Sequence, residues 1–150
     1  MVTTYERNTA TLLNLSTLTQ YFIPFGNYLF PILIWSLKKD KSQFVDYNGK
    51  QTLNFQLSIL LYSLVLVLIA VPTLIYSVFR NVTFSEFQNG GFEAHRIAPE
   101  NITGVLAVAL IAVFLFFTLK VGEFFLIINA AVKNSNGENY KYPLSISFLK

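Results

Sequence analysis

The chain lacks cysteine altogether, and its 150 residues include one histidine and few charges. The absence of cysteine excludes disulfides, thiolate metal sites, cysteine catalysis and a lipid anchor on cysteine. Charged residues make up 13% of the chain, against about 25% in soluble domains. The N-terminus, Met1–Arg7, also lacks the basic start of a cleaved signal peptide, so we expect the first hydrophobic run to stay in the mature protein.

Three long runs carry no charge at all: Asn8–Leu37, Gln51–Phe79 and Asn101–Leu119. A helix needs about 20 apolar residues to cross a bilayer. The runs therefore predict an all-α integral membrane protein, and the length suits a single membrane domain over residues 1–150. The basic residues lie mostly at the ends of the runs, where membrane topology places them, so the bilayer is the expected partner and nucleic acid is not.

The second and third runs predict two long transmembrane helices, over residues 43–79 and 101–133. A polar stripe follows one face of the first of these helices, at the spacing i, i+3, i+7 and i+11, and consists of Gln51, Asn54, Ser58 and Tyr62. Unsatisfied polar groups are costly in hydrocarbon, so this stripe should face protein. Two interpretations stay open: a contact between helices, or the lining of a substrate path.

The first run differs because proline and glycine interrupt it. Pro24 cannot continue a regular helix, and Gly26-Asn27 is typical of a turn. We expect a Pro-broken helical hairpin, with helices over 9–21 and 28–37, the second containing Pro31. Non-helical backbone at membrane depth survives only where it is buried in protein or faces water, so the turn is a candidate functional element.

Lys120 and Glu123 are the only charges within the third hydrophobic stretch, between the run that ends at Leu119 and its continuation from Phe124 to Val132. At i, i+3 on a helix they share a face and can pair. An ion pair inside a membrane is a candidate functional site. The alternative is that both residues lie near one interface and neutralise each other, with the lysine reaching toward water.

The remaining segments are an outer loop over residues 80–100 and a tail over residues 134–150. The loop holds the only histidine, His95, without the ligand spacing of a metal site, so we expect no metal, no cofactor and no catalytic residue. Asn134–Gly137 should end the last helix. Pro143 and a period of two then predict an extended tail. Its docking surface should receive Leu144, Ile146 and Phe148, with Tyr140 and Tyr142 at the level of the lipid headgroups.

The distribution of basic residues predicts the orientation. The connection Lys38–Lys50 and the tail are lysine-rich, whereas the loop at 80–100 has more acidic than basic residues. The positive-inside rule therefore places the first connection and the C-terminus in the cytoplasm. With a hairpin at the start, the N-terminus is cytoplasmic as well. The expected location is the bacterial cytoplasmic (inner) membrane.

Three motifs in order resemble a widespread bacterial family of small membrane proteins of unknown function. They are Ile23-Pro24-Phe25-Gly26-Asn27 with Pro31, Trp35 and Lys38-Lys39-Asp40; Phe44-Val45-Asp46 with Gly49-Lys50-Gln51 and Leu53-Asn54-Phe55-Gln56; and Asn136-Gly137-Glu138 with Tyr140-Lys141-Tyr142-Pro143. The family is distantly similar to the twenty-kilodalton membrane subunit of the chloroplast inner-envelope import translocon. That similarity implies four helical segments with both termini on one side. The Lys120/Glu123 interruption is not part of the resemblance.

Function is less constrained than fold. We expect a non-enzymatic accessory or scaffold subunit that binds another integral membrane protein or complex, in a process such as protein export or insertion. One alternative is a small oligomeric transporter or channel, and another is an envelope-stress or lipid-interacting protein that uses its lysine-rich edge. The candidate structural and partner-binding residues are Pro24, Gly26, Asn27, Pro31, Trp35, Gln51, Asn54, Lys120 and Glu123.

Overall fold

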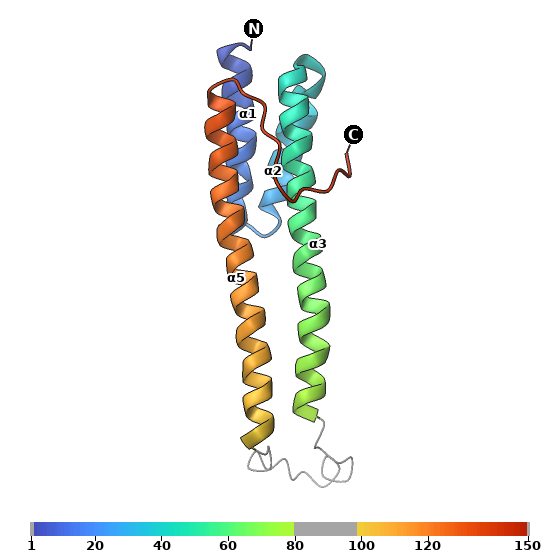
Figure 1. Cartoon of the computed structure of the whole chain (residues 1–150). Helices are drawn as coiled ribbons and strands as arrows, with labels where there is room; N and C mark the ends of the chain where they lie inside the picture. Colours follow the sequence, from blue (N-terminus) through green and yellow to red (C-terminus); the bar gives the residue numbers. More distant parts are fainter. Residues whose placement is uncertain (1, 80–98, 150) are drawn as a thin grey trace. The chain divides into compact units, whose positions relative to one another are not determined.

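The computed structural model describes residues 2–79 and 99–149, and this part of the chain is all-helical (Figure 1). Its α-helices are α1 (Thr4–Ser16), α2 (Gly26–Lys38), α3 (Gln43–Phe79) and α5 (Pro99–Ser135), with short 3₁₀-helices η1 (Thr17–Tyr21) and η2 (Lys39–Lys41). The predicted fold class, with an initial hairpin and two long apolar helices, is confirmed. Most of the predicted outer loop, with His95, lies outside the described residues.

The described chain divides into two compact units. Unit 1 consists of Met1–Leu61 and Leu119–Lys150, and unit 2 consists of Tyr62–Thr118. Unit 1 holds the N-terminal hairpin, the first part of α3, the last part of α5 and the tail. Each long helix contributes to both units, so a single membrane domain stays our prediction.

The hairpin breaks where proline and glycine predicted a break. Helix α1 begins at Thr4 because Thr3 and Glu6 form a capping box, with Thr3 N–H donating to the Glu6 carboxylate at 2.7 Å. The chain continues through η1 and turns before α2 begins at Gly26, with Phe25 in the left-handed region at φ 62°. A Cβ at position 26 would collide with Thr19, so glycine lets the two arms of the hairpin approach closely.

Helix α3 is the central helix of unit 1. Five consecutive residues, Thr52–Gln56, are buried, which requires neighbours on every side of the helix. The N-terminus of α3 is capped by Ser42, whose hydroxyl accepts the Val45 N–H at 3.2 Å. One turn later Lys50 pairs with Asp46 at 2.7 Å. The Ser42 cap and the Asp46–Lys50 pair thus stabilise the first turns of α3, and the turns that follow are buried in protein.

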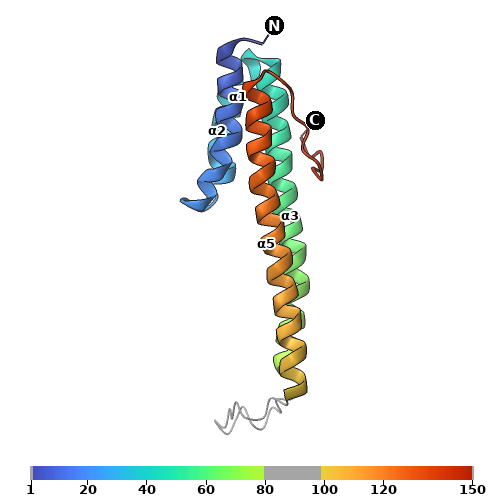
Figure 2. The same ribbon diagram turned by 60° about the vertical axis from the view of Figure 1, so that its left-hand side comes forward.

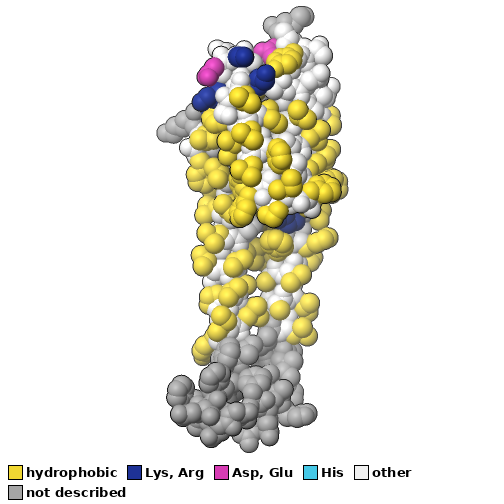
Figure 3. All heavy atoms as spheres, turned by 180° about the vertical axis from the view of Figure 1, so that it is seen from behind, with side chains coloured by type: hydrophobic (Ala, Val, Ile, Leu, Met, Phe, Trp, Pro, Cys, Tyr) yellow, Lys and Arg dark blue, Asp and Glu magenta, His cyan; other side chains and the backbone are white. Residues whose placement is uncertain are grey.

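Unit 2 has a different surface, because its helical segments expose apolar side chains. Leu68 is 62% exposed and Phe114 is 68% exposed. By length and composition, Gln43–Tyr76 and Leu106–Ser135 can cross a membrane. In Figure 3 hydrophobic side chains cover much of the visible described surface, and most of the visible charged side chains cluster apart from them, although a basic side chain also lies among them. Such faces are suited to lipid contact.

The last helix ends as predicted, with Gly137 in the left-handed region at φ 82° and the Glu138 N–H bonded to the Lys133 carbonyl at 3.0 Å. The tail then runs from the end of α5 to α3 without forming a helix or strand over residues 138–149 (Figures 1 and 2). Its expected attachment is partly wrong. Tyr142 is 3% exposed and lies in the core, so its ring contacts protein and not lipid headgroups.

The apolar side chains expected to dock the tail are only partly covered by the protein. Leu144, Ile146 and Phe148 are 79%, 40% and 49% exposed. The ring of Tyr142 instead stacks on Phe55, with centroids 4.2 Å apart. The core cluster around this pair also contains Ile59, Ile127 and Ala130. The tail is therefore anchored by an aromatic ring and by main-chain bonds to Asn54.

A candidate site built from buried amides

Asn14 lies at the centre of a buried polar network and uses all of its hydrogen-bonding capacity. Its amide nitrogen donates to the Ala10 carbonyl at 2.9 Å and to Asn134 Oδ1 at 2.6 Å. Its carbonyl oxygen accepts the hydroxyls of Thr52 at 2.7 Å and Tyr142 at 2.6 Å. An amide side chain has two donor hydrogens and two acceptor lone pairs, so every one is satisfied. This single residue connects α1 to α3, α5 and the tail.

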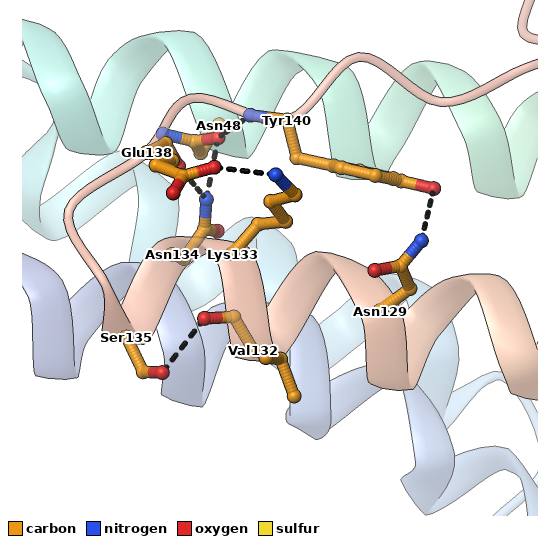
Figure 4. Close-up of polar contacts among 8 residues, drawn as sticks. All are labelled: Asn48, Asn129, Val132, Lys133, Asn134, Ser135, Glu138 and Tyr140. Carbon is orange, nitrogen blue, oxygen red and sulfur yellow. Dashed lines mark hydrogen bonds and ion pairs between the residues drawn. The ribbon is translucent and has the colours of Figure 1, made fainter.

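Asn134 and Asn48 continue the network toward the end of unit 1, as Figure 4 shows. The Asn134 amide nitrogen donates to Asn48 Oδ1 at 2.8 Å and to the Glu138 carbonyl at 2.9 Å. The Asn48 carbonyl oxygen also accepts the Tyr140 N–H at 3.0 Å, and its nitrogen donates to Asn139 Oδ1 at 2.9 Å. We call Asn14, Asn48, Thr52, Asn134 and Tyr142 the amide network. It fixes the first residues of the tail against both long helices.

The amide network is neutral and closed. Four of its members are at most 2% exposed, and Tyr142 is 3% exposed. Burial raises the pKa of the Tyr142 phenol above its ordinary value, so this hydroxyl stays protonated and acts as a donor. A network of this kind rigidifies a core and specifies its helix partners, because a misplaced helix would leave amides unsatisfied. It offers no acid, base or nucleophile poised for catalysis.

The charged pair forms a second buried cluster, in which Gln20 is the third member. Lys120 Nζ lies 2.8 Å from Glu123 Oε2, which confirms the predicted pairing. Gln20 donates to Glu123 Oε1 at 2.9 Å and accepts a hydrogen bond from Lys120 at 3.2 Å. The Glu123 side chain is fully buried, whereas 29% of the Lys120 side chain is exposed. The three residues bond one another, and the cluster joins η1 to α5.

The predicted turn residues position the hairpin against α3. Asn27 donates to Gln56 Oε1 at 2.8 Å, and the Tyr28 hydroxyl donates to the Gln56 carbonyl at 3.3 Å. Pro24 is exposed in the turn, whereas Pro31 is buried within α2. The Gln56 amide nitrogen is buried and has no protein acceptor. These contacts attach the first residues of α2 to α3, whereas the turn itself, residues 22–25, is exposed.

Trp35 fastens the far end of α2 to the start of α3. Its indole N–H donates to Asp46 Oδ1 at 2.9 Å, and Lys39 lies over its ring at 5.0 Å from the centroid. The ring packs so closely on α3 that a Cβ at Gly49 would overlap it. Trp35 and Gly49 are therefore a matched pair at this helix crossing.

The predicted polar stripe on α3 is divided by the structure. Asn54 and Ser58 are buried, at 2% and 0% exposure, and both bond the main chain of the tail. Gln51 is half-buried and takes no part in the amide network. The interpretation as a protein contact holds for Asn54 and Ser58. The tail occupies the position that a substrate path along this stripe would need.

A cleft of about 600 Å³ marks the end of unit 1 where the N-terminus, the first connection and the tail meet. It is lined by Val2, Glu6, Lys41, Ser42, Gln43, Phe44, Tyr47 and Asn139. A hydrogen bond from Ser42, followed by bonds from Thr3, lowers the pKa of Glu6 to about 2, so this carboxyl is ionised at neutral pH. The N-terminus, the first connection and the tail thus lie at the same end of unit 1, as a helical hairpin at the start of the chain requires.

Sequence reasoning missed the most connected residues. Asn48, Thr52 and Asn134 stand among other polar residues, so no one of these positions stands out in the sequence, and Asn14 and Gln20 belong to the polar positions of the first run. The available signal was the i, i+4 spacing of Asn48, Thr52 and Gln56, which forms a stripe beside the predicted one. Within the described residues, no group of three or more His, Cys, Asp or Glu side chains is placed to hold a metal ion.

Comparison with known proteins supports the resemblance to a family of small membrane proteins. Residues 5–149 match the magnetosome magnetite crystal formation protein family. No curated protein and no solved structure matches the chain. The distant similarity to the chloroplast translocon subunit has no support in these comparisons. Because the match covers nearly the whole sequence, the chain belongs to the magnetosome magnetite crystal formation protein family.

Proposed function

We propose that this protein is a non-enzymatic accessory or scaffold subunit of a membrane protein complex. The amide network carries the proposal, because its buried polar groups are bonded to one another and join α1, α3, α5 and the tail. Buried groups committed in this way serve a fixed architecture. The exposed apolar faces of unit 2 supply lipid contact, and the hairpin supplies a surface for another membrane protein.

The proposed orientation places the N-terminus, the Lys38–Lys50 connection and the tail in the cytoplasm. The cleft at the end of unit 1 supports this arrangement, since residues of all three segments line it. The lysines of these segments then follow the positive-inside rule. The membrane is the bacterial cytoplasmic membrane or one derived from it.

Membership of the family adds a finer proposal, that the complex acts in a membrane where magnetite crystals form. We assign the contribution to membrane organisation, because the buried polar groups of unit 1 are bonded to one another. A complex concerned with protein export or insertion is the other finer proposal, and identification of the partner separates the two.

The experiment is purification of the tagged full-length chain from native membranes in mild detergent, followed by identification of what accompanies it. We expect another integral membrane protein in constant ratio to the tagged chain. As a control, the Asn8→Ala variant should purify with the same partner, because Asn8 is exposed on α1 and lies outside the amide network. Recovery of the chain without any constant partner, together with solute flux in reconstituted liposomes, would replace the scaffold with the transporter alternative.

A further inference from the structure

The tail binds α3 through its main chain. The Asn54 amide nitrogen donates to the Leu149 carbonyl at 3.0 Å, while its oxygen accepts the N–H groups of Leu149 at 2.7 Å and Phe148 at 3.1 Å. One helical turn later, the Ser58 hydroxyl oxygen accepts the Ile146 N–H at 2.8 Å. Two buried side chains of α3 thus bond main-chain N–H and C=O groups of the tail, as the edge strand of a β-sheet would.

The spacing of the two α3 residues suits two main-chain N–H groups that lie two residues apart in the tail. Residues i and i+4 of a helix are about 6 Å apart along its axis, slightly less than the roughly 6.6 Å that two residues of a fully extended chain span. Asn54 and Ser58 bind the N–H groups of Phe148 and Ile146, and between these residues the tail turns tightly, with the Phe148 N–H also bonded to the Ile146 carbonyl at 3.1 Å. The side chains of these tail residues stay about half exposed, so the contact depends little on their identity.

The tail reaches this site through a strained turn. Leu144 has φ 60°, in the left-handed region that glycine prefers and leucine rarely adopts. It follows Pro143, and upstream of both the ring of Tyr142 is buried against Phe55. An extended backbone at Leu144 would release the strain while Tyr142 remained in place. Strain in a short hinge is a condition that favours exchange of a terminal segment between copies.

We propose that Asn54 and Ser58 form a main-chain docking site that receives the C-terminal tail of a second copy of this chain in exchange for its own. The segment that fits the site is present in every copy, and exchange gives a symmetric pair. Residues 144–149 span at most about 20 Å when extended. That is about two helix diameters, so the two copies contact each other directly through this face of α3.

The test uses the natural absence of cysteine. Full-length Ser58→Cys and Ile146→Cys chains, carrying different tags, are co-expressed and oxidised in the membrane. We expect a disulfide-linked heterodimer in severalfold higher yield than with Leu60→Cys in place of Ser58→Cys. Leu60 is a suitable control because it lies on the same helix and is 49% exposed. A yield no higher than that of the control would overturn the proposal.

A second variant tests the strained hinge. Leu144→Gly removes the strain of the left-handed conformation in the unexchanged chain, because glycine adopts that conformation freely. Exchange then no longer releases strain, so we expect severalfold less heterodimer at unchanged abundance and helical content. A chain carrying both Ser58→Cys and Ile146→Cys reports the unexchanged form as an intramolecular disulfide, and this product should increase with Leu144→Gly. If Leu144→Gly leaves the partition between the two products unchanged, hinge strain does not drive exchange and the proposal fails in this form.

Discussion

Replacing Asn14 by leucine tests the amide network at its most connected residue. The substitution keeps the branched shape and the number of side-chain heavy atoms but removes the bonds to Asn134, Thr52 and Tyr142. The Thr52 hydroxyl retains an alternative acceptor, the Asn48 carbonyl at 2.8 Å. Two buried groups, the Asn134 carbonyl oxygen and the Tyr142 hydroxyl, are left without these partners.

The expected loss follows from those two groups. In soluble proteins a buried polar group without its partner costs about 1–3 kcal/mol. Hydrogen bonds between membrane helices average about 0.6 kcal/mol, with a maximum of about 1.7. We therefore expect Asn14→Leu to lower the free energy of unfolding by about 1–4 kcal/mol. The effect should exceed that of Asn8→Ala, whose side chain is exposed on the same helix.

A double-mutant cycle with Tyr142→Phe makes the measurement specific. Tyr142→Phe alone leaves Asn14 with the Thr52 hydroxyl, so its cost should be about 1 kcal/mol. In Asn14→Leu/Tyr142→Phe the stranded hydroxyl is gone, and the combined loss should fall below the sum of the two single losses. Unfolding in mixed detergent micelles, followed by circular dichroism, gives all three values. Additive losses would refute the reasoning, because the two side chains would then not share a bond.

Two further substitutions test the other contacts of unit 1. Glu123→Leu should destabilise the protein by about 1–3 kcal/mol, because Lys120 loses its buried partner but remains 29% exposed and keeps the Gln20 acceptor. The double replacement of both residues by leucine should be milder, and a double variant worse than either single one would contradict a compensating pair. Gly49→Ala should lower the free energy of unfolding by about 1–3 kcal/mol, because the added Cβ displaces the Trp35 ring. Gly122→Ala, with open space around its Cβ position, should be neutral or stabilising. Equal effects of the two glycine variants in thermal unfolding would rule out the close approach of Trp35 and Gly49.

The sequence was most informative where one residue type limits the backbone locally. Pro24 and Gly26 located the hairpin break, and the bounds of α3 agree with the predicted 43–79. The last helix begins and ends two residues outside the predicted 101–133. The spacing of Lys120 and Glu123 was also sufficient to predict their contact.

The polar contacts between distant segments were less predictable. The pairing of Asn14 with Asn134 requires that α1 lie against the end of α5, and no local pattern specifies that neighbour. Gln20 bonds Glu123 of the charged cluster although it is distant in sequence, and no local pattern predicts that contact either. In the tail, the alternation of apolar residues suggested side-chain docking. Main-chain bonds to Asn54 and burial of Tyr142 supply the attachment instead.

The most direct test of the scaffold account is whether water-borne reagents reach the amide network in the folded protein. Thr52→Cys places a thiol at a position that is 0% exposed, in a chain without other cysteines. Gln43→Cys, at an exposed position of the same helix, is the matched control. In native membranes, with the helical content of both variants confirmed, a charged thiol reagent should modify Gln43→Cys readily and leave Thr52→Cys unmodified. Modification of Thr52→Cys at a rate close to that of Gln43→Cys would show a water-filled path through these polar residues and would contradict the account.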